Sequence, residues 1–449
     1  MPDKKIFCTS PWLHMKVGYD GNYVPCRWMP PGSEVDKTTV GNMSLMEFFN
    51  SDHMKQFRTN LFSDQPTKAC SACAYQDSFG KVSGRSLQLF RSKISLNSFD
   101  QDYEKSHHHQ MFEYSRDNAG QTTSYPYDLQ VNLSNVCNSA CIMCGPKSSS
   151  RLVQDYHKLA KKSHPMFYYP EKVEYWGEDP ALVEKFIGYL KELPSIDYLH
   201  LLGGETLYLE SFWRICEALI DAEMAEKIYL GTTTNLTLYS ERLENIITKF
   251  SKFHVGLSIE SVNSLNDYIR YPSEITSVMG NLYKFLKLRD RFPEKINLTL
   301  RITPNIFSIF YIDELIQFMC DHNITAESTE ILFRPACLRI ELMPDNLKLI
   351  AIDKLKKVIE KNSLSRSRVV DTRNHLLTHS IISSVAYSYL DFLENMVDPA
   401  DGDKHRYDLV QFLTGFESLR DNSILDYAPD YKDFLIEYGY DINTARSIQ

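Results

Sequence analysis

Short apolar segments alternate with amphipathic segments from about residue 127 to residue 335, and this alternation constrains the fold more than any other feature. The segments between them space their apolar side chains as amphipathic helices do. Strands that alternate with helices form parallel sheets through right-handed βαβ connections. Six such units predict an α/β fold with a partial (β/α)6 barrel. The six predicted strands are YDLQVNL (127–133), LHLLGG (199–204), IYLGTTTN (228–235), HVGLSIE (254–260), INLTLRIT (296–303) and TEILFRP (329–335).

A cysteine-rich loop directly follows the first predicted strand. Its sequence, CNSACIMC, contains Cys137, Cys141 and Cys144. A disulfide framework uses an even number of cysteines, and a closed zinc site uses four ligands. Three thiolates on one loop instead suit a metal centre that keeps one coordination position open. Because the chemistry of α/β barrels gathers at the C-terminal ends of the strands, we expect the centre at that end. A zinc or structural site completed by a distant residue is the alternative.

The motif Cys-x₃-Cys-x₂-Cys after the first strand, with Leu-Gly-Gly-Glu after the second, resembles the radical S-adenosylmethionine (SAM) superfamily over residues 127–335. The resemblance implies that Cys137, Cys141 and Cys144 bind three irons of a [4Fe–4S] cluster. It further implies that SAM binds the fourth iron through its methionine amine and carboxylate. Reduction of the sulfonium then releases a 5′-deoxyadenosyl radical, which removes hydrogen from unactivated carbon.

The same resemblance implies which residues form the SAM pocket. Gly203 and Gly204 lack a Cβ and would let the backbone approach SAM closely, and Glu205 would accept the methionine ammonium. Ser258 and Glu260, in the SIE stretch, resemble the pair that hydrogen-bonds the ribose hydroxyls. The remaining matches are Thr234 and Asn235 at the cofactor pocket and Arg301 for the methionine carboxylate. Met143 departs from the pattern, because many members have an aromatic residue there, but its thioether can pack against adenine.

Four further cysteines lie in the first 73 residues: Cys8, Cys26, Cys70 and Cys73. The sequence HMKVGYDGNYVPC, which ends at Cys26, predicts a β-hairpin with an Asp-Gly turn. This arrangement resembles the twitch and SPASM modules, auxiliary iron–sulfur domains of many radical SAM enzymes, over residues 7–85. It implies a second [4Fe–4S] cluster whose irons are all bound by protein. No cysteine follows in AYQDSFGKVSGRS, which favours the shorter twitch form, and a zinc ribbon is the alternative.

These patterns divide the chain into four predicted regions. They are an auxiliary cluster module (1–85), a connector (86–125), the radical SAM partial barrel (126–340) and a mainly helical C-terminal region (341–449). The C-terminal region carries helical spacing but no motif of known chemistry.

Composition limits where the protein works and what it binds. The formal net charge of −9 gives no general attraction to nucleic acid. No apolar run has the length of a membrane span, and the start lacks the apolar run of a signal peptide, so we expect a cytoplasmic protein. Ten cysteines in that compartment favour metal or redox chemistry over disulfides.

We therefore expect a radical SAM enzyme that acts on a peptide, a protein side chain or a small metabolite. Its expected partners are SAM, this substrate and a reductant such as flavodoxin or ferredoxin, with no membrane. The alternatives are an iron–sulfur protein that binds SAM without turnover, and a radical SAM enzyme acting on a nucleotide or nucleic acid.

Overall fold

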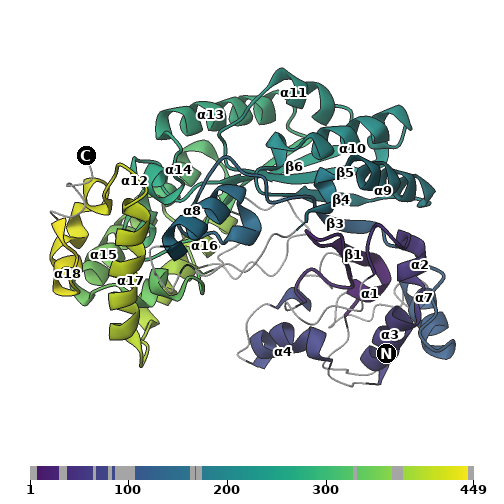
Figure 1. The fold of residues 1–449 in the computed structure, drawn as a ribbon, viewed down its shortest axis with the longest axis horizontal. Coiled ribbons are helices and arrows are strands. Elements are labelled where there is room, and N and C mark those ends of the chain that lie inside the picture. Colours follow the sequence, from purple (N-terminus) through teal and green to yellow (C-terminus); the bar gives the residue numbers. More distant parts are fainter. Residues whose placement is uncertain are drawn as a thin grey trace. The chain divides into compact units, whose positions relative to one another are not determined.

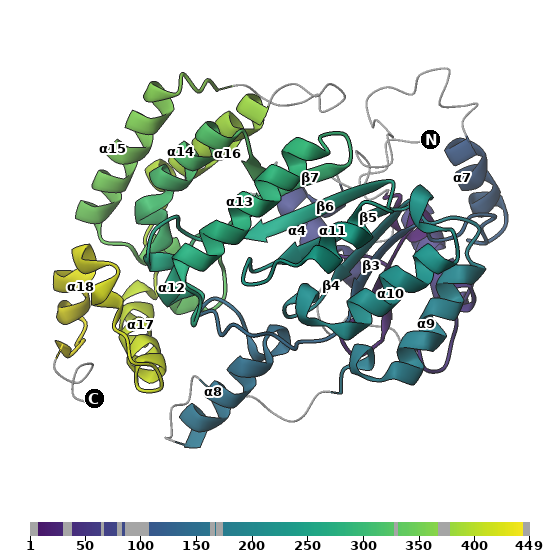
Figure 2. The ribbon, with the colours of Figure 1, turned by 90° about the horizontal axis from the view of Figure 1, so that it is seen from above.

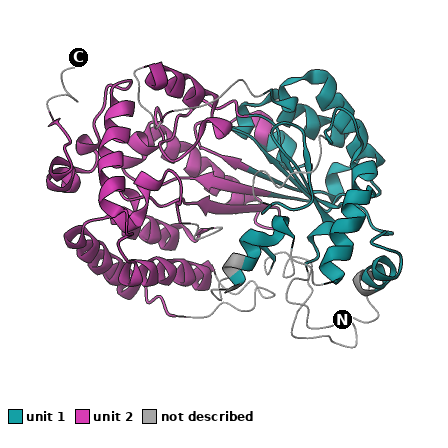
Figure 3. Ribbon diagram, turned by 60° about the horizontal axis from the view of Figure 1, so that its bottom comes forward, with its two compact units in different colours: residues 1–134, 172–232, 244–253 teal, residues 135–171, 233–243, 254–449 magenta. Residues whose placement is uncertain are grey.

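The computed structural model describes residues 8–29, 38–63, 67–78, 83–85, 107–161, 167, 174–326, 331–366 and 378–442. Two compact units divide the chain (Figure 3). Unit 1 comprises residues 1–134, 172–232 and 244–253, and unit 2 comprises residues 135–171, 233–243 and 254–449.

Eight strands follow the order β2-β1-β3-β4-β5-β6-β7-β8. The pairs β1–β3, β3–β4, β4–β5 and β7–β8 are parallel, and β1–β2 is antiparallel. The predicted α/β class with a mostly parallel sheet is therefore confirmed. The strands are β1 (His14–Val17), β2 (Tyr23–Val24), β3 (Asp128–Asn132), β4 (Tyr198–Leu202), β5 (Tyr229–Thr234), β6 (Lys252–Ser258), β7 (Ile296–Arg301) and β8 (Thr325–Ala326).

The N-terminal hairpin forms as its turn sequence predicts. It also pairs with a strand of the sheet, which the sequence did not indicate. Lys16 pairs with Val24 across β1 and β2, and Gly21 in the turn has a φ of +80°, which glycine adopts without a steric cost. On its other side β1 pairs in parallel with β3, with His14 opposite Asp128. The hairpin thereby extends the sheet of unit 1.

Unit 1 carries helices beside this sheet and a separate aromatic core. In α9 the Asp179 side chain caps the first turn by accepting from the Ala181 amide at 2.8 Å. α9 and α10 lie side by side (Figure 1). In the N-terminal part, Trp12 packs edge-on against Phe62 and Phe112. The helices are α1 (Ser10–Leu13), α2 (Leu45–Phe49), α3 (Asp52–Phe62), α4 (Ser71–Ser78), α7 (His107–Asp117), α9 (Pro180–Glu192) and α10 (Glu210–Asp221).

Unit 2 combines the later strands with the C-terminal helices. α14, α15 and α16 pack against one another (Figure 2). The predicted helical character of the C-terminal region is thus confirmed. The helices are α8 (Ser150–Lys161), α12 (Leu265–Ile269), α13 (Ile275–Arg291), α14 (Ile312–His322), α15 (Asp345–Lys361), α16 (Thr378–Asn395), α17 (Gly402–Glu417) and α18 (Lys432–Glu437), and α11 (Glu241–Ile247) has residues in both units.

The sixth strand lies earlier than the sequence predicts. β8 is formed by Thr325 and Ala326, which pair with Thr299 and Leu300 of β7. Residues 331–335 of the predicted strand are not in a strand, and residues 329–330 lie outside the described residues. The apolar run there suggested burial in a sheet, but Phe333 is 69% exposed.

Among the helices that the structure describes, none is both long and apolar enough to cross a membrane.

Candidate functional site

The cysteine loop runs from the end of β3 to α8, and its part in unit 2 is closed on itself by hydrogen bonds. The Ser150 amide donates to the Asn135 carbonyl at 2.8 Å, and the Asn135 side-chain amide donates to the Pro146 carbonyl at 2.8 Å. The Ser149 hydroxyl donates to the Ser139 carbonyl at 2.6 Å. Short-range bonds within residues 135–150 therefore define the loop's conformation.

The middle of the loop is also bonded to the last residue of α12 and to the segment that follows it. The Ala140 amide donates to the Tyr271 carbonyl at 2.6 Å, and the Ile142 amide donates to the Ile269 carbonyl at 2.9 Å. Cys141 stands between these two bonds and is buried, with 4% of its surface exposed. Cys137 and Cys144 are half-buried.

The three thiols lie near one another and are not electrostatically equivalent. A hydrogen bond from Cys144 and the nearby Arg270 and Arg420 lower the pKa of Cys141 to about 6, although burial acts in the opposite direction. The same hydrogen bond, together with burial and the neighbouring Cys137, raises the pKa of Cys144. Since the thiolate is the form that binds metal, the loop favours an ionised sulfur at Cys141.

Arg270 links Cys141 to Glu260. Its Nη1 lies 3.8 Å from Cys141 Sγ, and its Nη2 donates to Glu260 Oε1 at 2.6 Å. The other carboxylate oxygen of Glu260 accepts from the Thr303 amide at 2.8 Å. Burial raises the pKa of Glu260 to about 7, while Arg270 and the Thr303 amide lower it. Both oxygens of Glu260 thus have protein partners, and its side chain is wholly buried.

A second arginine reaches the loop from the C-terminal region. Arg420 Nη2 donates to the Ala140 carbonyl at 2.7 Å and lies 3.4 Å from Asp155 Oδ2. Its guanidinium carbon lies 4.6 Å from the centre of the Tyr271 ring, a cation–π contact. Arg270 and Arg420 were missed from the sequence. Neither arginine lies in a sequence pattern that indicates its contact with the loop.

Asn235, predicted at the SAM pocket, is bonded to the cysteine loop. Its side-chain amide donates to Asn138 Oδ1 at 2.8 Å and to Ser139 Oγ at 2.9 Å. Thr234, just before it, is buried, and its Oγ1 accepts from the Leu236 amide at 3.2 Å. The end of β5 is therefore bonded to the loop that carries the cysteines.

The remaining predicted residues of unit 2 occupy the loop and two strand ends. Met143 is 9% exposed on the cysteine loop, and Ser258 is half-buried at the end of β6. Arg301 ends β7 and lies over Gly256, where a Cβ would stand 2.5 Å from Arg301 Nε. Because Gly256 has no Cβ, the Arg301 side chain can occupy this space.

The Gly-Gly-Glu motif belongs to unit 1 and follows β4. The Gly204 amide donates to the Ser134 carbonyl at 2.8 Å. A Cβ on Gly203 would lie 2.4 Å from Leu209 Cδ1, so a larger residue would force the Leu209 side chain to move. Glu205 is almost completely buried and accepts from the Leu207 amide at 3.2 Å.

The four N-terminal cysteines also lie near one another, within unit 1. Burial raises the pKa of Cys8, and electrostatic repulsion from Cys26, Cys70 and Cys73 adds to this shift. Burial likewise raises the pKa of Cys26 to about 11. The Trp28 amide donates to Cys26 Sγ at 3.4 Å.

The surroundings of Cys141 fit an anionic iron–sulfur cluster. Arg270 Nε, Arg420 Nε and Arg420 Nη1 are buried without a hydrogen-bond partner among the described residues, and sulfide and thiolate sulfurs accept such bonds. Across the same residues, no three His, Cys, Asp or Glu side chains are grouped to hold a single metal ion. Each thiolate of a [4Fe–4S] cluster binds a different iron, so the cysteines of a cluster need not lie as close together as the ligands of a single ion.

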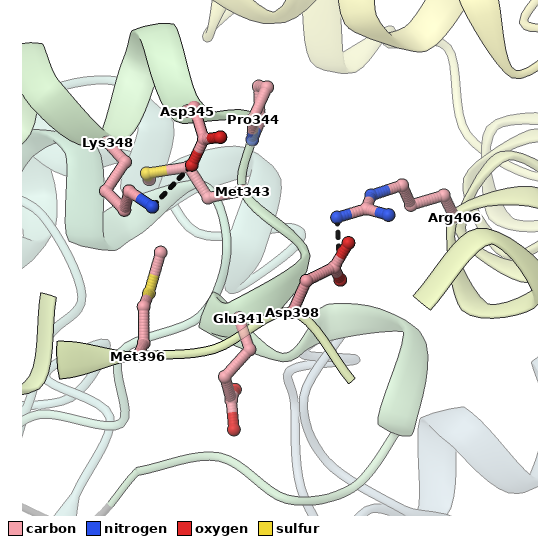
Figure 4. Close-up of a pocket in the computed structure, with 8 residues that line it drawn as sticks. All are labelled: Glu341, Met343, Pro344, Asp345, Lys348, Met396, Asp398 and Arg406. Atoms are coloured by element: carbon pink, nitrogen blue, oxygen red, sulfur yellow. Dashed lines mark hydrogen bonds and ion pairs between the residues drawn. The ribbon is translucent and has the colours of Figure 1, made fainter. Parts of the chain in front are cut away.

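A small pocket of about 90 Å³ lies elsewhere in unit 2, in the C-terminal region (Figure 4). None of its lining residues is among the predicted site residues. They are Glu341, Met343, Pro344, Asp345, Lys348, Met396, Asp398 and Arg406.

Comparison with known proteins gives two family matches. Residues 131–299 match the radical SAM superfamily, and residues 8–74 match the SPASM iron–sulfur cluster-binding domain. No curated protein matches the chain.

Two solved structures illustrate the similarity of this chain to known proteins. SuiB of Streptococcus suis bound to the precursor peptide SuiA is 17% identical, with a TM-score of 0.35, over 69% of this chain and 62% of that one. Native anSMEcpe with bound S-adenosylmethionine is 14% identical, with a TM-score of 0.33, over 52% of this chain and 62% of that one. The chain thus spans 62% of the length of each.

Proposed function

We propose, from the premise that this chain is a radical SAM enzyme with an N-terminal iron–sulfur cluster-binding domain, that it removes a hydrogen atom from a peptide or protein side chain. A bound [4Fe–4S] cluster and SAM supply the radical chemistry that no amino-acid side chain can provide. The chain's own residues bind and orient these groups and place the substrate.

The cysteine loop is the proposed ligand of the SAM-binding cluster, through Cys137, Cys141 and Cys144. One observation carries this assignment. Cys141 lies within the residues that match the radical SAM superfamily. It is buried in a hydrogen-bonded loop, and two buried arginines, Arg270 and Arg420, lie near its sulfur. Cationic groups beside a buried thiolate compensate the negative charge that an iron–sulfur cluster brings.

The SAM pocket is proposed to use the residues at the strand ends. Glu205 would accept the methionine ammonium, with Gly203 and Gly204 beside it. Arg301 would pair with the carboxylate, and Ser258 would donate to the ribose. The other proposed pocket residues are Met143 at adenine, Thr234 at the pocket wall, Asn235 bonded to the cysteine loop, and Glu260 bonded to Arg270.

The N-terminal cysteines are proposed to bind a second [4Fe–4S] cluster. Cys8, Cys26, Cys70 and Cys73 offer four thiolates, enough to bind all four irons and leave none for substrate. The match of residues 8–74 to an iron–sulfur cluster-binding domain supports this proposal over a zinc ribbon. Its role would be electron transfer or support of the substrate cavity.

The proposed substrate class rests on the same module. Twitch and SPASM domains largely accompany radical SAM enzymes that modify peptides or proteins, and the chain matches such a domain. The proposed reductant is a small electron-transfer protein such as flavodoxin or ferredoxin.

The proposal is tested by incubating the reconstituted protein with SAM and dithionite without oxygen. We expect 5′-deoxyadenosine to form, and a protein with both clusters that forms none would contradict the proposal. Co-expression with short peptides encoded beside its gene, followed by intact mass measurement, tests the substrate class. A mass change in a peptide supports the proposal. If no peptide changes mass, these peptides are excluded as substrates.

A further inference from the structure

We propose that Arg270 is a positioning residue that raises the reduction potential of the cluster bound by the cysteine loop. This inference rests on the proposed function, because it takes Cys141 as an iron ligand. It adds a residue that the cysteine motif and the predicted SAM pocket do not contain.

The contact between Arg270 and Cys141 is direct. Nη1 lies 3.8 Å from Cys141 Sγ, within hydrogen-bonding range for sulfur. The guanidinium is planar and always charged, so one face of its fork can serve Cys141 while the other serves a second acceptor.

Glu260 is that second acceptor, and it fixes the guanidinium. Arg270 Nη2 donates to Glu260 Oε1 at 2.6 Å. Glu260 is in turn bonded from two directions, since its Oε2 accepts from the Thr303 amide at 2.8 Å and its own amide donates to Asn266 Oδ1 at 3.1 Å. This chain of bonds directs the other arm of Arg270 at the sulfur.

Burial makes the contact electrostatically effective. Arg270 is 8% exposed and Glu260 is 0% exposed, so water screens their charges poorly. Arg270 Nε is also buried and lacks a hydrogen-bond partner among the described residues. A cluster sulfur beside Cys141 would therefore meet further donor capacity on the same guanidinium.

The direction of the effect follows from charge. Reduction of a [4Fe–4S] cluster by one electron adds a negative charge. A fixed cation and an N–H···S hydrogen bond stabilise the more negative state, and hydrogen bonds to sulfur and net charge are among the factors that set cluster potentials. Removing Arg270 should therefore make the cluster harder to reduce.

Arg406 provides a matched control in the same unit. It is also 8% exposed, and it forms an ion pair of 2.9 Å with Asp398, drawn as a dashed line in Figure 4. Its described hydrogen bonds and ion pairs are with carboxylates and the Leu342 carbonyl, not with a cysteine, and its guanidinium lies over the Tyr438 ring. Its loss tests what removing any buried, ion-paired arginine does to this unit.

The experiment is a redox titration of the reconstituted full-length protein without SAM, followed by electron paramagnetic resonance. The signal that changes when SAM is added afterwards identifies the cysteine-loop cluster. In Arg270→Met we expect the equilibrium constant for one-electron reduction to fall at least tenfold, which is about 59 mV. In Arg406→Met the potential should stay at the wild-type value.

Removal of Arg270 leaves the buried Glu260 without its cation and is expected to destabilise the fold. The double variant Glu260→Gln with Arg270→Met removes both charges, and its potential should still fall because the bond to Cys141 is gone. A wild-type potential in either folded variant would overturn the inference. So would a folded double variant that binds no iron at the loop, which would assign Arg270 to cluster assembly instead.

The two proposals fail separately. If the wild-type protein makes no 5′-deoxyadenosine but the potential falls in Arg270→Met, the enzyme function is wrong and the inference stands. If 5′-deoxyadenosine forms and the potential does not move, only the inference is wrong.

Discussion

Cys141 of the loop and Cys26 of the N-terminal module offer the same donor atom in opposite electrostatic surroundings. In the loop of unit 2, Cys144 and two buried arginines lower the pKa of Cys141 to about 6. In the N-terminal module, burial raises the pKa of Cys26 to about 11, and Cys8 lies in an apolar cluster around Trp12. The cysteine spacing predicts metal ligands in both groups, whereas the surrounding residues determine how readily Cys141 and Cys26 ionise.

This difference bears on how each group binds metal. Cysteine must lose its proton to bind iron. The loop favours the thiolate of Cys141 before any metal binds, whereas burial favours the protonated thiol at Cys8 and Cys26.

The largest expected effect comes from removing a loop cysteine. Replacing Cys137, Cys141 or Cys144 with alanine should abolish SAM cleavage, because two thiolates cannot bind the cluster while leaving one iron open. The measurement is 5′-deoxyadenosine formation under anaerobic reduction. Iron should remain in the N-terminal module of each variant. A Cys141→Ala protein that makes 5′-deoxyadenosine at the normal rate would refute the separation of the two groups.

Removing two N-terminal cysteines should have a different result. The double variant Cys70→Ala with Cys73→Ala should still cleave SAM, because the loop and strand-end residues are unchanged, while product from the substrate falls away. Assays of 5′-deoxyadenosine and of product on the same sample measure this uncoupling. A thermal melt is the control, because Cys70 packs against the core around Trp12. A folded variant with normal product formation would show the module to be dispensable.

Glu205 separates SAM binding from cluster binding. Glu205→Ala should weaken SAM affinity by roughly tenfold to a hundredfold, since a charge-assisted hydrogen bond in a partly dry site is worth about 1.5–3 kcal/mol. Iron content should stay at the wild-type value. Titration of the reduced cluster with SAM measures the affinity, and an unchanged value would place the ammonium partner elsewhere.

A further expected effect is an opposite pH dependence of stability in the metal-free chain. The pKa of Cys141 is lowered from 9.0 to about 6, so its contribution is present above pH 9 and is lost as the pH falls toward 6. The pKa of Cys26 is raised from 9.0 to about 11, so its contribution is present below pH 9 and is lost as the pH rises toward 11.

Urea unfolding across this pH range measures both effects. Cys141→Ser should flatten the rise in unfolding free energy between pH 6 and 9, and Cys26→Ser should flatten the fall above pH 9. Identical profiles for the two variants would remove the electrostatic distinction between the groups.

Much of the fold follows from local sequence, and the missing parts are long-range. The strand before the cysteine loop and the Asp20-Gly21 turn are set by neighbouring residues, so they could be predicted. The pairing of β1 with β3 could not, because a hairpin sequence does not specify what lies on its outer edge. The sixth strand was misplaced because the apolar run around Phe333 resembles a strand, although Phe333 is 69% exposed.

The candidate site shows the same limit. The loop cysteines are identified by their own spacing, but the residues that surround them come from far along the chain. Arg270 lies 129 positions from Cys141, and Arg420 lies 280 positions from Ala140. Neither contact leaves a pattern in the sequence around the cysteines. The electrostatics of the site therefore required the folded structure.

The bond from Arg420 to the Ala140 carbonyl has a consequence for the order of biosynthesis. During translation the ribosome reaches Arg420 280 codons after Ala140, so the nascent cysteine loop lacks this contact for most of the time in which the chain is made. The loop acquires this partner only once the segment after α17, which carries Arg420, has emerged and docked. A cluster bound by the loop with this contact in place would therefore enter only after Arg420 has been translated, whereas Cys8, Cys26, Cys70 and Cys73 all leave the exit tunnel early and close together in time.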